Sequence, residues 1–314
     1  MEEPQKRHTV TNLEKKVLYN TVAKNFLIKS GIVKGDTSKL KVGMICTGGA
    51  QAGVFSAGLL CHMIDLGMND KLDVVVGISA SAPNLAHFLT KDGRSAIANY
   101  WEENLDGFIK PWRLWKIVDL DKLEHSMHYG RVLDIEAVKD NPTKFYVAVT
   151  DMNGNGELID VKESTDIIDP ILATCSLPVF WNKPREVNGK LYVDGSISLP
   201  LPVEEIATRF SLTDLLVVTN STPEVFSEEY SFFQKIFAHF MLRKFSNSLK
   251  KTCFNAPSVS SESLENANSG ILSNGCRIAI ISPSYNIRKD CSDVNVLKKF
   301  GEEGKRKAQD FFSI

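Results

Sequence analysis

The chain has 314 residues, of which 37 are basic and 38 acidic, so its formal net charge at pH 7 is -1. Its apolar content of 43% is typical of a globular protein that buries a sizeable core. A protein that holds a nucleic-acid backbone usually carries a clear basic excess, so this balance argues against nucleic-acid binding. The six cysteines show no C-x-x-C spacing and predict reduced thiols without a zinc site. Together with a charged start that is not typical of a signal peptide, they predict a cytoplasmic protein.

Residues 42–64 carry no formal charge, and a stretch of this length could cross a bilayer. The segment also contains five glycines and the polar residues Thr47, Gln51 and His62. Glycines and central polar side chains weaken membrane insertion. We therefore expect a strand followed by a helix here and not a transmembrane span.

The N-terminal region predicts one helix. Thr11 and Glu14 have the spacing of a capping box, and apolar residues follow at helical intervals, so residues 11–29 are expected to form an amphipathic helix that docks on the main body. We treat residues 1–39 as an N-terminal helical extension and residues 40–314 as the principal domain.

From residue 40 onward, short apolar runs alternate with helical stretches. The alternation is typical of an α/β fold in which helices cover both faces of a mainly parallel sheet, so we expect a three-layer sandwich. Turn residues at 151–156 predict a hairpin, and the Gly-, Ser- and Asn-rich residues 255–275 predict a mobile loop. The expected strands are 41–46, 72–76, 145–149, 158–161, 191–193, 215–219 and 277–281, and the expected helices are 51–66, 79–89, 166–175, one from Val203 and one from about Val294.

A serine lies where a buried strand is expected to turn into a helix. The strand residues 74–76 are followed by Gly77, Ser79 and Ser81 in the pattern G-x-S-x-S. Hydrolase nucleophiles commonly sit in the related pattern G-x-S-x-G, because a tight turn with small neighbours exposes the hydroxyl above the sheet. The helix that follows would direct N–H groups toward charge forming near the hydroxyl. Alternatively, Gly77 and Ser79 are only a turn and a helix cap.

A glycine-rich turn precedes this serine by one predicted strand. Gly48, Gly49 and Ala50 lie between a strand and a helix, where backbone N–H groups can point at an anion. A nucleotide site is the competing hypothesis. The Walker pattern is missing and the glycine spacing fits the dinucleotide fingerprint poorly. We interpret the turn as a donor group for the oxyanion of an ester intermediate.

The serine needs a group that accepts its proton, and histidine is the commonest choice. His87 is eight residues along the helix from Ser79, about 12 Å away at 1.5 Å per residue. His239 remains possible because some hydrolases have a late histidine, although its neighbours look like one face of an apolar helix. Asp194, at a predicted strand end before Gly195, is the better candidate.

Taken together, the glycine-rich turn, the serine pattern and Asp194 resemble the patatin-like phospholipase family, and the resemblance covers roughly residues 40–312. That family has a glycine-rich oxyanion loop, a G-x-S-x-G elbow and a later D-G-G or D-G-A, and it uses a Ser/Asp dyad without histidine. Further similar segments are 173–178, 202–205 and 303–305. The resemblance implies a patatin-like fold and an enzyme that hydrolyses fatty-acyl esters of phospholipids or lysophospholipids through an acyl-serine, with no metal or organic cofactor. The residues implied are Ser79 as nucleophile, Asp194 as base, Gly48, Gly49 and Ala50 as oxyanion donors, and Gly77, Ser81 and Gly195 as supporting motif residues.

The sequence also departs from the family pattern. Ala50 and Ala52 replace the third glycine and the arginine of the loop G-G-G-x-R-G, Ser81 ends the elbow, and Ser196 follows Asp194-Gly195. A Cβ at position 50 narrows the allowed backbone angles. The departures leave open a second hypothesis, a catalytically inactive lipid-binding protein. A Ser/Asp/His239 triad esterase is a third.

Residues 232–251 combine aromatic side chains at helical spacing with five basic residues that face no acid in the segment. Such a helix could lie in the interface of an anionic membrane, giving the protein a peripheral membrane contact. The alternative is an ordinary helix that covers the acyl pocket or the core.

Overall fold

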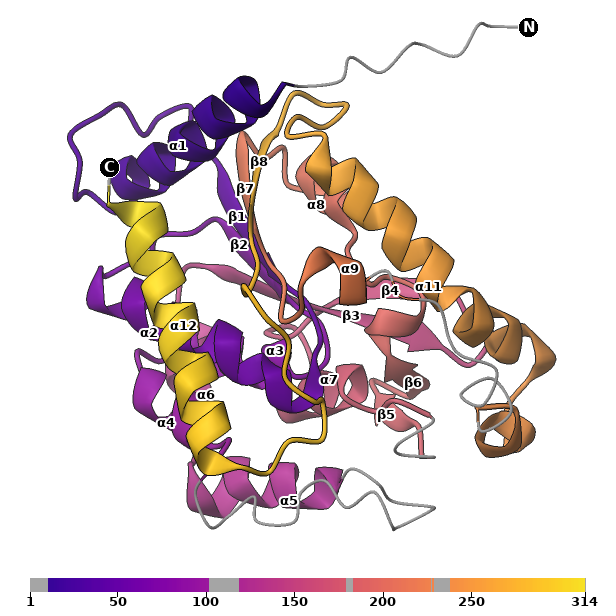
Figure 1. The fold of residues 1–314 in the computed structure, drawn as a ribbon. Coiled ribbons are helices and arrows are strands. Elements are labelled where there is room, and N and C mark those ends of the chain that lie inside the picture. The colour runs from indigo at the N-terminus through magenta and orange to yellow at the C-terminus, as the bar shows by residue number, and fades with distance from the viewer. Residues whose placement is uncertain (1–10, 102–118, 179–182, 227, 229–237, 314) are drawn as a thin grey trace, which may run out of the picture.

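The computed structural model describes residues 11–101, 119–178, 183–226, 228 and 238–313. Its centre is an eight-stranded sheet with the order β5-β6-β3-β2-β1-β7-β8, and β4 pairs with β3 (Figure 1). The five strands β1, β2, β3, β7 and β8 are parallel, whereas β4, β5 and β6 join antiparallel. The strands are β1 (Val42–Cys46), β2 (Val74–Gly77), β3 (Lys144–Asp151), β4 (Gly156–Asp160), β5 (Arg185–Val187), β6 (Lys190–Asp194), β7 (Asp214–Val218) and β8 (Arg277–Ile281).

Helices cover both faces of this sheet. Figure 1 shows α2 and α12 on one side and α8 and α11 on the other. The α-helices are α1 (Asn12–Lys29), α2 (Val54–Asp65), α3 (Ser81–Leu89), α4 (Gly93–Ala98), α5 (Leu120–His125), α6 (Ile135–Asp140), α7 (Ile168–Thr174), α8 (Val203–Arg209), α9 (Pro223–Phe226), α11 (Asn247–Asn268) and α12 (Val294–Phe312). Short helical turns are η1 (Ala50–Gly53), η3 (Ser126–Gly130), η4 (Gly195–Ile197) and η5 (Leu242–Lys244).

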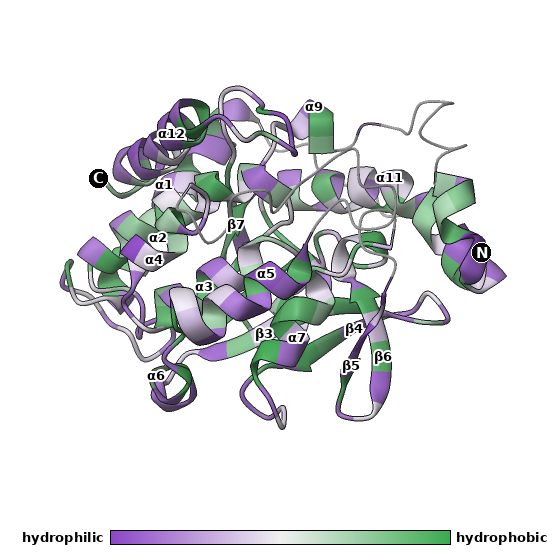
Figure 2. Ribbon diagram, turned by 90° about the horizontal axis from the view of Figure 1, so that it is seen from below, coloured by the Kyte–Doolittle hydropathy of each residue, from purple (hydrophilic) through white to green (hydrophobic). Residues whose placement is uncertain are grey.

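Alternation along each strand divides the apolar core between the two faces. In β1, Met44 and Cys46 belong to the cluster that includes residues of α2 and α12, whereas Ile45 belongs to the cluster with residues of α8 and α11. Side chains of a strand point to opposite faces in turn, so one strand serves both clusters. In Figure 2 the strands are mostly in hydrophobic colours while α12 mixes hydrophobic and hydrophilic residues. The expected three-layer α/β sandwich with a mainly parallel sheet is confirmed.

Most expected elements are present with boundaries shifted by a few residues. The uncharged segment 42–64 divides into β1, η1 and α2, and no helix in the described part of the chain is long and apolar enough to cross a membrane. The turn at 151–156 connects β3 and β4 as a hairpin. The N-terminal helix begins after Thr11 with both hydrogen bonds of the capping box, and Phe26 and Leu27 are buried against the main body.

The prediction of a mobile loop at residues 255–275 is wrong, because α11 continues to Asn268. Its composition looks like a loop, but its buried residues recur at intervals of three and four. Many of these residues are small or polar, so they carry little hydropathy although they face the protein. The buried positions are Leu249, Cys253, Ala256, Pro257, Ser260, Leu264 and Ala267.

The prediction of a single helix over residues 232–251 is also wrong, as far as the described residues 238–251 show. The turn η5 is followed by Phe245 in an extended conformation, and Ser246 then caps the start of α11. Residues 232–237 lie outside the described residues. Phe245 is buried, whereas Phe240 is 48% exposed.

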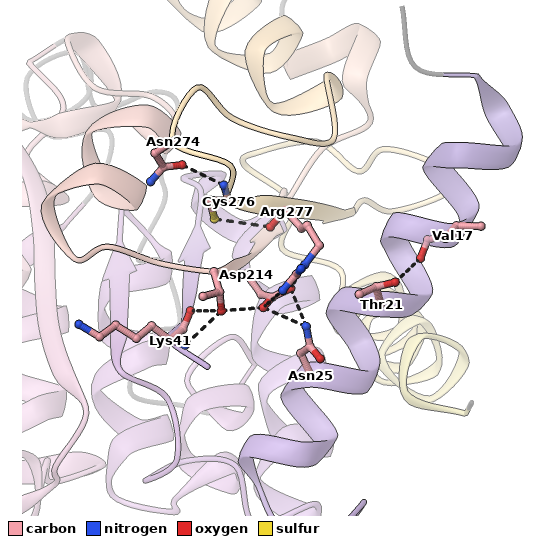
Figure 3. Close-up of polar contacts among 9 residues, drawn as sticks. Val17, Thr21, Asn25, Lys41, Asp214, Asn274, Cys276 and Arg277 are labelled. Atoms are coloured by element: carbon pink, nitrogen blue, oxygen red, sulfur yellow. Dashed lines mark hydrogen bonds and ion pairs between the residues drawn. The ribbon is translucent and has the colours of Figure 1, made fainter. Parts of the chain in front are cut away.

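An ionic cluster at the start of β7 joins the N-terminal helix to the sheet (Figure 3). Asp214 is fully buried and accepts two hydrogen bonds from the Arg277 guanidinium, at 2.7 and 2.8 Å. Both oxygens also lie 3.0 Å from Nδ2 of Asn25 in α1, and the Thr213 hydroxyl donates at 2.8 Å. A buried carboxylate is tolerated when its oxygens are paired in this way.

Replacing Asp214 should therefore destabilise the whole domain. Asp214→Ala leaves the Arg277 guanidinium and the Asn25 amide without their shared acceptor, so we expect the free energy of unfolding to fall by roughly 3 kcal/mol. Urea denaturation followed by circular dichroism measures this. Asp310→Ala, which removes an exposed i,i+4 pair with Arg306, is the matched control and should cost about 0.5 kcal/mol or less. Equal effects of the two substitutions would contradict this role for the cluster.

Candidate active site

Ser79 occupies a strained turn between β2 and α3. Its φ angle is 52°, in the left-handed region that side chains other than glycine seldom adopt. The turn is held from both sides, since the Ser79 N–H donates to Oγ1 of Thr174 at 2.9 Å and the Ser79 carbonyl accepts from Ala82 at 2.9 Å. Gly77 is the last residue of β2, and α3 begins at Ser81, two residues later than expected. This is the geometry of a nucleophile elbow.

The glycine-rich loop that follows β1 lies directly beside the serine. A Cβ built on Gly48 would lie 3.0 Å from the Ser79 Cβ and 3.6 Å from its Oγ, so a side chain at position 48 would crowd the serine. The N–H of Thr47 donates to Val218 and the N–H of Gln51 donates to Lys289. Between them, the amides of Gly48, Gly49 and Ala50 donate to no acceptor among the residues that the structure describes. These three amides are therefore free to bind an anionic oxygen.

Ser81, the departure from glycine in the elbow, holds the start of this loop. Its hydroxyl lies 2.6 Å from the Thr47 carbonyl and 3.1 Å from the Ser56 hydroxyl. Asn220, which follows β7, donates to the same carbonyl at 2.6 Å and to the Ser81 hydroxyl at 2.9 Å. All four residues are buried, so these bonds lie away from water, where an unmade bond would be costly. The cluster fixes the loop relative to the elbow.

Asp194 lies at the same level of the sheet as Ser79. The register pairs Gly77 with Val147 and Asp194 with Val149, two residues further along β3. Gly195 is required beyond it because a Cβ there would come within 2.1 Å of the Ala148 carbonyl oxygen. Asp194 is fully buried, and its Oδ1 accepts the N–H of Ser196 at 2.8 Å.

The surroundings of the Asp194 carboxyl shift its pKa. Burial raises its pKa to about 6, the dominant effect, while the Ser79 hydroxyl and the Ser196 N–H favour the charged form. The Lys289 ammonium also lowers this pKa. The Asp194 Oδ2 accepts no hydrogen bond of good geometry from the described part of the chain. The Ser79 hydroxyl is nevertheless close enough to lower the pKa of the carboxyl. The Oδ2 atom is available for a proton.

Ser79, Asp194 and the free amides line one cavity of about 460 Å³. Much of its remaining wall is apolar and comes from α5, the segment after α7, and α11. Pockets of this size and character bind the apolar part of a ligand and orient it with a few polar groups. Representative apolar lining residues are Leu120, Leu123, Leu177, Ile197 and Phe254.

None of the described residues that line the cavity is a histidine. His239 is exposed, although its neighbour Ala238 lines the cavity. His87 is buried beside Asn99, and burial lowers its pKa to about 4.

Several features of the site were missed in the sequence. Lys289 and Glu228 line the cavity from segments without a recognisable motif, and α11 contributes its wall from residues that look like a loop. Asn220 could have been suspected only from its place after a buried parallel strand, where side chains gather at the carboxyl edge of an α/β sheet.

Ala50 adopts the conformation that its side chain makes unfavourable. Its φ angle is 50°, in the region where glycine is preferred. Ala50→Gly should therefore raise the free energy of unfolding by about 1 kcal/mol or less, because it relieves strain that outweighs the added freedom of the unfolded chain. Thermal denaturation measures the change.

The matched control is Ala52→Gly, two residues along in η1. Ala52 is buried and does not have a positive φ, so its replacement should lower the free energy of unfolding by about 1 kcal/mol. Destabilisation by both substitutions would show that Ala50 is not strained.

Comparisons with known proteins identify the family of the chain. The sequence model of the patatin-like phospholipase family matches residues 44–207, just over half of the chain, which includes the loop, the elbow and Asp194. The uncharacterized protein YjjU of Escherichia coli strain K12 is 27% identical over 192 residues, covering 58% of this chain and 52% of YjjU, so the chain spans about half the length of that relative.

Among solved structures, VipD from Legionella pneumophila is similar with a TM-score of 0.51 and 11% identity. The similarity covers 87% of this chain and 66% of VipD, and at this identity it concerns the fold. The family match, which covers more than half of the chain, decides the classification. The chain belongs to the patatin-like phospholipase family.

Proposed function

We propose that this chain is a serine acyl hydrolase of the phospholipase A or lysophospholipase type, with Ser79 as nucleophile and Asp194 as base. Members of the family are generally lipid acyl hydrolases. The observation that carries the proposal is that a strained serine, a buried carboxylate and three uncommitted amides line one largely apolar cavity.

The reaction begins when the Asp194 carboxylate accepts the Ser79 proton and Oγ attacks the ester carbonyl carbon. The amides of Gly48, Gly49 and Ala50 stabilise the oxyanion of the tetrahedral intermediate. Collapse of that intermediate breaks the ester bond, and the leaving alcohol takes the proton from Asp194. A water molecule, deprotonated by Asp194, then attacks the acyl-serine, and the bond to Oγ breaks as Asp194 returns the proton to the Ser79 hydroxyl and the fatty acid is released.

Burial explains how an aspartate can act without histidine. An aspartate in water has a pKa of about 3.9 and is a weak base, whereas the raised pKa of Asp194 brings its basicity closer to neutral pH. Its position near the Ser79 hydroxyl compensates for the basicity that is still lacking, because a positioned base need not find its proton by diffusion.

The acyl chain would lie along the apolar wall of the cavity, beside Leu120, Leu123 and Phe254, while the carbonyl carbon lies at Ser79. We infer that the head group and any second chain stay toward the opening.

The proposal is tested by mass spectrometry of the products that the full chain releases from mixed phospholipids and lysophospholipids. Ser79→Ala and Asp194→Asn should each lower kcat by about a thousandfold or more, as in other hydrolases that lose part of a catalytic unit. Asp310→Asn, an exposed change, and His239→Ala should retain activity. Loss of activity in His239→Ala would favour a triad, and lipid binding without turnover by the wild type would favour an inactive lipid-binding protein.

The raised pKa of Asp194 predicts opposite effects of pH on activity and stability. Because the carboxylate is the reactive form, kcat/KM should rise as the pH increases through about 6. The folded pKa lies above the unfolded value, so the buried charge destabilises the fold at pH values above about 6, and this penalty disappears below about pH 4.

Asp194→Asn should therefore be more stable than the wild type at pH 8, by at most about 3 kcal/mol, and should lose this advantage near pH 4. Chemical denaturation at both pH values measures the difference. A variant that is less stable than the wild type at pH 8 would contradict a raised pKa.

We also propose that residues 238–251 contact lipid surfaces. Phe240 is exposed beside Arg243, whose guanidinium lies 4.7 Å from the ring centroid, and Ala238 in the same turn lines the cavity. An exposed aromatic ring beside cations is suited to an anionic interface. A membrane contact at these residues would lie next to the cavity.

Phe240→Ser should weaken binding to anionic phospholipid vesicles several-fold while hydrolysis of a soluble short-chain ester continues. Vesicle sedimentation measures binding. Ile32→Ser, which removes a residue of similar exposure after α1, is the control and should bind like the wild type. Unchanged binding of Phe240→Ser would remove this surface from the account.

A further inference from the structure

One cation faces the reactive groups. Among the described residues that line the cavity, the charged side chains are Asp194, Glu228 and Lys289. Lys289 lies between β8 and α12, and its carbonyl accepts the N–H of Gln51 at 3.1 Å. This bond holds the Lys289 backbone against the glycine-rich loop. The loop has no cation of its own, because Ala52, where the family pattern has arginine, is small and buried.

The Lys289 ammonium is not neutralised by a direct contact. The negative charges of Glu228 and Asp194 act to raise the pKa of Lys289. No residue that the structure describes forms an ion pair of 4.0 Å or less with it. Lys289 as a whole is exposed and lines the cavity. Desolvation by the protein around its ammonium nevertheless lowers its pKa. Surrounding protein disfavours the charged form, and an anion bound in the cavity would restore it.

The apolar wall suits the acyl chain, and the carbonyl carbon must lie at Ser79. The part of the substrate that remains is the alcohol portion, which for a phospholipid or lysophospholipid carries a phosphate. Phosphate oxygens accept charge-assisted hydrogen bonds from an ammonium. A neutral acylglycerol has no group that would use this cation.

We propose that Lys289 binds the phosphate of the substrate head group and thereby selects phosphate-bearing esters over neutral acylglycerols. The inference rests on the proposed function for its substrate class. In this role Lys289 determines specificity, and its hydrogen bond to Gln51 couples it to the oxyanion loop.

The test compares kcat/KM for a lysophospholipid and for a monoacylglycerol with the same chain. Lys289→Met should lower the ratio of the two values at least tenfold, as expected for loss of a charge-assisted hydrogen bond, and Lys289→Arg should retain most of it. Arg288→Met, the adjacent exposed cation paired with Asp290, is the matched control and should leave the ratio unchanged. If Lys289→Met lowers both rates in parallel, Lys289 acts through Asp194 and the inference is wrong.

A binding measurement separates this inference from the proposed function. In the Ser79→Ala background, where turnover is blocked, the lysophospholipid should bind at least tenfold more weakly when Lys289→Met is added, whereas binding of the monoacylglycerol should change much less. Glycerol phosphate should compete with the lysophospholipid for the Ser79→Ala variant, and it should compete much less once Lys289→Met is added. Equal loss for both lipids would overturn the inference even if hydrolysis by the wild type had never been detected.

Discussion

Two residues that carry side chains, Ala50 and Ser79, have left-handed backbone conformations at the ends of the adjacent parallel strands β1 and β2. Each costs free energy, and such strain persists only where the surrounding structure determines it. Here the restraint comes from Thr47, Ser81 and Asn220, whose buried hydrogen bonds join the loop after β1 to the elbow after β2 and to the end of β7. The parallel order of these strands makes the arrangement possible, because it brings three carboxyl ends to one edge.

The same edge explains the character of Asp194. The chain reaches Asp194 along β6, which runs antiparallel to β3, and the Asp194 side chain is fully buried. Burial destabilises a charged carboxylate but raises its basicity, and the two consequences have the same cause. Under the proposed function, this site would exchange some stability of the folded state for reactivity, the trade-off known from other enzymes.

The sequence could predict what depends on local spacing. Alternating strands and helices predicted the layers, and G-x-S-x-S after three valines predicted the position of the elbow, because turns and strand periodicity are determined by neighbouring residues. It could not predict α11, whose buried face includes many small residues, nor the break before Ser246 that divides the helix considered over residues 232–251. Lys289 and Asn220 were also missed, since their places depend on how distant strands pair. Ser81 was identified only as a departure from a pattern, whereas its hydroxyl is a structural tie to Thr47.

The role of Ser79 is central to the account, and covalent labelling addresses it most directly. The full chain is treated with a fluorophosphonate that carries one long acyl-like chain, digested, and mapped by tandem mass spectrometry. The account predicts a single adduct on the Ser79 hydroxyl, formed faster at pH 8 than at pH 5 because Asp194 must be charged to accept the proton. An adduct on a different serine, or none at any pH, would contradict it.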